Sequence, residues 1–140
     1  MEFRGNVQTR LKKLEDGVAT CTFLAMAGLN RLGLENVAQS AIEPDEMLPA
    51  IAQGAIGIEW REEDKQITDI LQKIHHKQTE QRLNVERAFL AELDGSCQTP
   101  IAGLAVIEGS SLKFTGQVLR TDGSESISET AHCNLSLIHI

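Results

Sequence analysis

The change of pattern after Pro100 constrains the fold of this chain more than any other feature. Residues 101–107 and 112–119 are rich in apolar and β-branched side chains, and a short turn containing Gly109 separates them. Two such runs joined by a glycine turn predict a β-hairpin. The segments before Pro100 have mostly helical spacing, so the hairpin is expected to pack on a helix. This order predicts two domains that join near Lys77.

Four segments before the hairpin are expected to be helical. Val7, Leu11 and Leu14 lie at helical spacing, with Asn6 placed to cap the helix and Asp16-Gly17 placed to end it. The second segment, residues 25–32, is rich in Ala and Leu and is followed by Gly33. The third is a stripe of Ile67, Ile70, Leu71 and Ile74 after an acidic turn. In the fourth, Thr79 is expected to be the cap, and the inner face is predicted to be Leu83, Val85, Ala88, Phe89 and Leu93.

Two other segments are predicted to be strands. Residues 18–24 are apolar and β-branched, which is typical of a buried strand, and Cys21 within them is expected to be a small core residue. Residues 51–59 alternate small and β-branched side chains and follow a loop bracketed by Pro44 and Pro49. Together with the helices, these segments predict an α/β fold.

Composition excludes several classes of protein. The formal net charge of −7 argues against a nucleic-acid surface, because few basic groups could neutralise a row of phosphates. No apolar run reaches the roughly 18–20 residues that span a bilayer, so no membrane association is expected. The three cysteines are widely spaced, and His75 and His76 are adjacent, so neither a disulfide framework nor a metal site is predicted. The N-terminal residues lack the layout of a signal peptide, and we therefore expect a cytoplasmic protein with reduced thiols.

Three arginines are candidates for binding an anion. Arg4 and Arg10 flank the capped start of the first helix, where unpaired backbone N–H groups and a partial positive charge favour anions. Arg31 follows the second helix. A guanidinium can hold a carboxylate with two hydrogen bonds. Spacing alone favours three solvated side chains over an anion site.

Cys97 is the candidate reactive thiol. It follows the Asp94-Gly95-Ser96 turn and precedes Pro100, so it is expected on a loop, where a thiol is accessible. Spacing does not distinguish a reactive cysteine here from a half-buried one without a chemical role.

Five phrases of the sequence together resemble the porphobilinogen deaminase (hydroxymethylbilane synthase) family, in the family's order and spacing. They are RGNVQTR at residues 4–10, AMAGLNRLGL at 25–34, LPAIAQGAIGIE at 48–59, ERAFL at 86–90 and DGSCQTPI at 94–101. The resemblance extends from Arg4 to about Thr130. It identifies the chain as the C-terminal portion of such a transferase.

The resemblance implies a specific chemistry. Such enzymes join four porphobilinogen molecules head to tail into hydroxymethylbilane and release ammonia at each step. The growing chain is attached to a dipyrromethane cofactor, which a thioether fixes to the cysteine matched by Cys97. Arg4, Arg10 and Arg31 match arginines that bind the carboxylates of cofactor and substrate, and Gln53 is expected to line the same cleft.

The resemblance also implies a domain plan. We expect part of a two-domain unit like the periplasmic binding proteins, followed by a small α+β C-terminal domain with an antiparallel sheet. Residues 1–53 would belong to the second domain, 54–76 would return to the first, and 77–132 would form the cofactor-bearing C-terminal domain, incomplete because its closing helix is missing. Residues 133–140 match nothing expected there and are interpreted as a non-native tail, with a genuine terminal strand as the alternative.

Two departures from the family pattern affect the expected activity. The first half of the family's chain is missing here, including the aspartate that acts as general acid, so no catalytic residue is assigned and the 140-residue chain alone is expected to be inactive. Ser96 stands where the family commonly has glycine, which could restrict that loop. Two alternatives stay open, a module that only binds an anionic solute and an inert fragment. The parent enzyme is expected to be monomeric.

Overall fold

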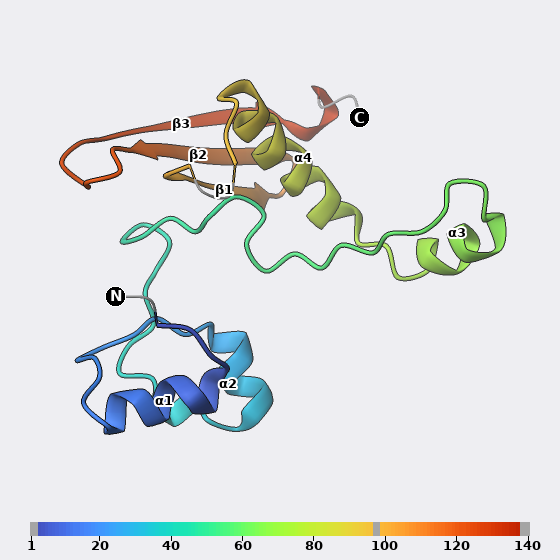
Figure 1. The fold of residues 1–140 in the computed structure, drawn as a ribbon. Helices are drawn as coiled ribbons and strands as arrows, with labels where there is room; N and C mark the ends of the chain where they lie inside the picture. Colours follow the sequence, from blue (N-terminus) through green and yellow to red (C-terminus); the bar gives the residue numbers. More distant parts are fainter. Residues whose placement is uncertain (1–2, 97–98, 138–140) are drawn as a thin grey trace. The chain divides into compact units, whose positions relative to one another are not determined.

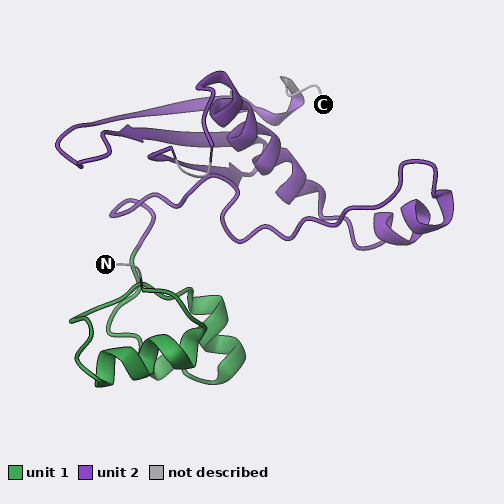
Figure 2. Cartoon of the chain, viewed as in Figure 1, with its two compact units in different colours: residues 1–42 green, residues 43–140 purple. Residues whose placement is uncertain are grey.

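A computed structural model of the chain describes residues 3–96 and 99–137 (Figure 1). The chain divides into two compact units, residues 1–42 and residues 43–140 (Figure 2). Each unit is described by itself below. The domain boundaries expected from the family plan stay predictions.

The first unit is helical. Helix α1 is Val7–Glu15, α2 is Met26–Leu32, and a short 3₁₀-helix, η1, is Glu35–Val37. Leu29 of α2 is 2% exposed and is the buried residue among those that the structure describes in this unit. Gly33 ends α2 with a φ of 65°, a left-handed conformation that glycine adopts without steric cost. The expected helices are therefore confirmed, including the Asn6 cap, whose side chain accepts a hydrogen bond from the Thr9 N–H.

The strand predicted for residues 18–24 is wrong. The structure has no regular element there, Phe23 is 67% exposed, and Cys21 is exposed rather than part of a core. An apolar, β-branched run forms a stable strand only when a neighbouring strand pairs with its backbone. No described segment pairs with residues 18–24, so the sequence preference is not realised.

The second unit contains a helix on an antiparallel sheet. Helices α3, Lys65–Gln72, and α4, Lys77–Glu92, precede strands β1, Ile101–Glu108, β2, Ser111–Leu119, and β3, Ser126–Asn134. A 3₁₀-helix, η2, follows at Leu135–Leu137. The strand order is β1-β2-β3, with both pairs antiparallel, and α4 covers one face of the sheet (Figure 1). The predicted hairpin on a helix is confirmed.

The core of this unit lies between α4 and strands β1 and β2. Ala105 and Leu112 are buried, and Phe89 of α4 meets Phe114 of β2 edge to face, with ring centroids 5.1 Å apart. Gly116 provides the space for this pair, because a Cβ atom there would lie 2.7 Å from the Phe89 Cζ. Aromatic pairs in this geometry contribute about 0.5–1.5 kcal/mol beyond the area they bury.

The cap expected for α4 is wrong, and its expected inner face is wrong in part. His76, rather than Thr79, caps the helix, and its Nδ1 accepts the Thr79 N–H. Phe89 packs on the sheet as predicted, but Ala88 and Leu93 are exposed. The side chains that reach β1, β2 and the turn after the helix are at 82, 86, 89 and 90, a spacing of one helix face.

Residues 51–59 also do not form the predicted strand. Residues 51–54 form a turn, and the residues after it have no regular structure. The nearest strand pairing is an isolated bridge between Ala50, just before this segment, and Ala102 of β1. The glycines at 54 and 57 lower the preference for a regular strand, since glycine loses the most backbone freedom when it is ordered.

Strand β3 includes Cys133 and Asn134, the first residues of the expected tail. Cys133 pairs with Leu112 and Asn134 with Ser111, so the register continues from the middle of the sheet. The strand alternative therefore applies to these two residues. Residues 138–140 lie outside the described part of the chain. No helix among the described residues is long and apolar enough to cross a membrane.

Candidate functional site

The turn before α1 positions two of the predicted arginines. Gly5 has a φ of 132°, and a side chain there would collide with Thr9, since a Cβ atom would lie 2.8 Å from the Thr9 Cγ2. The Arg10 Nε–H donates to the Gly5 carbonyl at 2.9 Å, and Lys13 Nζ donates to the Arg4 carbonyl at 2.8 Å. The Arg4-Gly5-Asn6 turn is thereby fixed to α1 by hydrogen bonds at two successive carbonyls.

The Nε–H bond also orients the Arg10 guanidinium. A guanidinium is planar and carries five N–H donors, so fixing one of them fixes the plane of the other four. Arg10 is half-buried in the first turns of α1, whereas Arg4 is exposed. The structure thus shows one arginine held in a defined orientation at the positive end of a helix, where an anion is favoured.

Arg31 lies in the last turn of α2 rather than after the helix. A Cβ atom at Gly28 would lie 3.8 Å from the Val7 Cγ2, so α1 and α2 are in contact at this point. Arg31 itself is exposed at the end of α2.

Gln53 is exposed in the turn of residues 50–54. Its N–H donates to the Ala50 carbonyl, and Gly54 and Ala52 both have positive φ, 79° and 60°. Glycine adopts this conformation freely, but alanine does so at a cost of about 1–3 kcal/mol. The turn that contains Gln53 is therefore strained and must be held by contacts with the surrounding residues.

Cys97, the predicted anchor, lies outside the described residues, but the residues on both sides of it are described. The Thr99 N–H donates to the Ser96 carbonyl at 3.0 Å, and the Ser96 N–H donates to the Thr99 Oγ1 at 2.9 Å. Gly95 lies against the Leu90 and Ile101 side chains, where a Cβ atom would have no room. Ser96 and Thr99 are thus bonded to each other, and β1 begins at Ile101.

Comparison with known proteins assigns the chain to a family. Residues 1–69 match the model of the porphobilinogen deaminase dipyromethane cofactor binding domain, and residues 81–137 match that of the porphobilinogen deaminase C-terminal domain. The chain belongs to the porphobilinogen deaminase family. Arg4, Arg10, Arg31 and Gln53 lie in the part that matches the cofactor binding domain, whereas Cys97 lies in the part that matches the C-terminal domain.

Two curated relatives show the extent of the similarity. The chain is 63% identical over 127 residues to the porphobilinogen deaminase of Paracoccus denitrificans, covering 91% of this chain and 41% of that protein. It is 50% identical over 127 residues to the porphobilinogen deaminase of Nitrobacter hamburgensis, covering 40% of that protein. The chain thus spans about two fifths of the length of these relatives.

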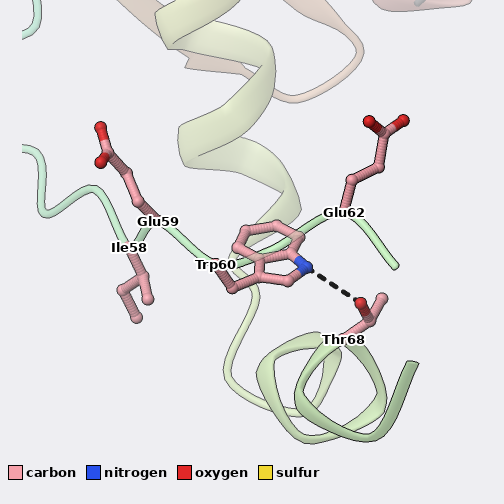
Figure 3. A pocket seen from close by; sticks show the side chains of 5 residues that line it. All are labelled: Ile58, Glu59, Trp60, Glu62 and Thr68. Atoms are coloured by element: carbon pink, nitrogen blue, oxygen red, sulfur yellow. Dashed lines mark hydrogen bonds between the residues drawn. The ribbon is translucent and has the colours of Figure 1, made fainter. Parts of the chain in front are cut away.

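Two surface hollows of the second unit contain carboxylates. One is lined by Trp60, whose indole N–H donates to the Thr68 Oγ1 at 2.9 Å, and by Glu59 and Glu62 (Figure 3). The other lies between residues 44–48 and the sheet face opposite α4, and contains Asp45 and Glu46 but a single lysine, Lys113. Carboxylates in both hollows would repel an anionic ligand.

Sequence reasoning missed one buried residue that contacts the turn containing Gln53. Glu86 of α4 is 4% exposed, and its carboxylate accepts hydrogen bonds from Ala52, next to Gln53, and from Ala105 of β1. The available signal was an Arg82/Glu86 pair, four residues apart, within an otherwise apolar helix face. Among the described residues, no group of three or more His, Cys, Asp or Glu side chains could hold a metal ion.

Proposed function

We propose that this chain is the cofactor-bearing portion of a hydroxymethylbilane synthase. The observation that supports the proposal is the match of both family models, in order, across residues 1–69 and 81–137. In the proposed reaction, four porphobilinogen molecules condense head to tail, and each condensation releases ammonia. The proposed parent enzyme is cytoplasmic and monomeric.

Cys97 is proposed to anchor the dipyrromethane cofactor. Its sulfur would form a bond to the aminomethyl carbon of a porphobilinogen unit while the carbon–nitrogen bond breaks and the nitrogen leaves as ammonia. A thiolate is the nucleophile required for this step. The resulting thioether, unlike a thioester, would not be hydrolysed between rounds. When bound, the cofactor supplies the terminal pyrrole carbon that is extended.

The residues present fit the carboxylates of such a group. Each pyrrole unit has two carboxylates, and Arg10 has the oriented guanidinium that bidentate recognition requires. Arg31, in the last turn of α2, and Arg4, before α1, are proposed to bind further carboxylates of cofactor and substrate. Gln53 is proposed to contact the substrate from the turn of residues 50–54.

The finer architecture is part of the same proposal. Residues 1–53 and 54–76 would belong to two domains resembling periplasmic binding proteins, and 77–132 to the C-terminal domain. The family's general acid has no counterpart among these 140 residues. General acid catalysis contributes about 10²–10⁴-fold in rate, so we expect the chain by itself to release no ammonia from porphobilinogen.

The test is intact-mass measurement of a chimera in which the N-terminal portion of the Paracoccus denitrificans enzyme precedes this chain. We expect the purified chimera to carry an added mass of two porphobilinogen units less two ammonia molecules. Cys97→Ser should remove this added mass, whereas the matched control Cys133→Ser, at an exposed cysteine, should retain it. An unmodified mass in the wild-type chimera would contradict the proposal. Reversible porphobilinogen binding that is unaffected by Cys97→Ser would instead support the solute-binding alternative.

A further inference from the structure

We infer that Glu86 is a positioning residue that fixes the turn carrying Gln53 to the strand that follows Cys97. The inference rests on the proposed function for its effect on substrate binding. Its structural part depends only on the contacts of Glu86. Among the described residues, Glu86 is the only buried charged side chain.

Both oxygens of the Glu86 carboxylate accept a backbone hydrogen bond. Oε2 accepts from the Ala52 N–H at 2.8 Å, and Oε1 accepts from the Ala105 N–H at 2.9 Å. A buried carboxylate is unfavourable unless hydrogen bonds replace its lost hydration, and bonds to an ionised acceptor are stronger than neutral ones. One carboxylate thus joins two backbone segments that are 53 residues apart in the sequence.

The turn that Glu86 holds is also fixed to β1 at its start. The Gly103 N–H donates to the Pro49 carbonyl at 3.0 Å, and Ala50 forms a bridge with Ala102. Gly103 leaves room for Ile51, whose Cδ1 would lie 2.7 Å from a Cβ atom there. Arg82, one helical turn before Glu86, donates to the Ala105 carbonyl at 2.6 Å. The edge of β1 is therefore occupied by this turn and by two side chains of α4.

These contacts explain how Ala52 keeps its left-handed conformation. A non-glycine residue persists at a φ of 60° only when its surroundings over-determine it. The Glu86 bond to the Ala52 N–H is one such constraint, and Gln53 is the next residue. Because β1 begins at Ile101, close after Cys97, Glu86 connects the proposed substrate-binding turn with the strand adjacent to the proposed anchor.

Glu86→Gln is the variant that separates this role from simple packing. Glutamine has the shape of glutamate, but one oxygen is replaced by an NH₂ donor, so only one of the two N–H groups can be accepted. Glu92→Gln, at the exposed end of the same helix, is the matched control.

The first measurement is amide hydrogen exchange of the 140-residue chain. Loss of a hydrogen bond to a charged group should accelerate exchange at Ala52, at Ala105 or at both by about 10- to 100-fold. Leu112, whose N–H has no contact with Glu86, should exchange unchanged, and Glu92→Gln should leave all three amides unchanged. Unchanged exchange at both alanines would overturn the inference. Equal acceleration at all three amides would also overturn it, because Glu86 would then only keep the unit folded.

The second measurement uses the chimera described above, with porphobilinogen as substrate. Glu86→Gln should retain the added mass on Cys97. It should raise KM by about 3- to 10-fold, the effect expected from the loss of one hydrogen bond to substrate, with a smaller change in kcat. An unchanged KM, or a loss of activity that follows the loss of folded protein, would overturn the role in substrate binding. A wild-type chimera without the added mass would contradict the proposed function itself, whereas the exchange result would still decide whether Glu86 positions the turn.

Discussion

Gly116→Ala is the substitution whose effect follows most directly from the packing of α4 on the sheet. A Cβ atom at Gly116 would lie 2.7 Å from the Phe89 Cζ and 3.1 Å from the Phe114 Cε1. Favourable carbon–carbon contacts lie at about 3.5–4.0 Å, so Phe89 must move by roughly 1 Å. Phe89 is itself packed edge to face on Phe114, which limits that movement.

The expected net effect is destabilisation. Overpacking of a core costs about 1–3 kcal/mol. Replacing glycine by alanine inside a strand recovers about 0.5–1 kcal/mol, because the unfolded chain has less freedom to lose. The free energy of unfolding should therefore fall by about 1–2 kcal/mol. With a urea m-value of about 1–3 kcal/mol/M, the unfolding midpoint should fall by roughly 0.5–1 M, measured by circular dichroism.

Gly57→Ala provides the matched control. The same methyl group would meet no atom within 4 Å at Gly57, so its midpoint should stay the same or rise slightly. Phe89→Leu should cost less in the Gly116→Ala background than alone, since the shorter side chain removes the colliding atom. Equal midpoints for the two alanine variants, or strict additivity with Phe89→Leu, would refute the steric argument.

Two further predictions concern the caps and turns. Asn6→Ala removes the acceptor of the Thr9 N–H and should lower the free energy of unfolding of α1, followed by thermal unfolding, by about 1 kcal/mol. Asn6→Asp should retain the cap. Equal stability of the two variants would contradict a capping role. Hydrogen bonds from the Ser124 N–H and hydroxyl lower the pKa of Asp122 below its usual range. Because the folded-state pKa of Asp122 is lowered, these bonds stabilise the turn at any pH above the usual pKa of an aspartate. The stabilisation is lost as the pH falls through the lowered pKa. Ser124→Ala should raise the Asp122 pKa in an NMR titration, and an unchanged pKa would contradict the hydroxyl contribution.

The elements that the sequence predicts correctly are those determined by local chemistry. Asn6 and Gly33 delimit their helices through contacts within a few residues, and the hairpin is joined at Gly109, which has a φ of 62°. The strand expected at residues 18–24 fails because pairing is not a local property. Strand β3 is the converse case. Its residues, from Ser126 to Asn134, are all exposed, and only its register with β2 makes it a strand.

The candidate site shows the same division between local and long-range causes. Arg4, Arg10 and the turn between them follow from sequence, because Gly5 and Asn6 act within one helical turn. Glu86 could not be found by looking for apolar periodicity, since a charged residue is normally assigned to the solvent face. Its burial becomes favourable only because two backbone N–H groups, from Ala52 and Ala105, are brought to its two oxygens. A hydrophobic replacement would leave both groups without the Glu86 acceptor, so the polar residue on this helix face is required by the turn and by β1 rather than by the helix.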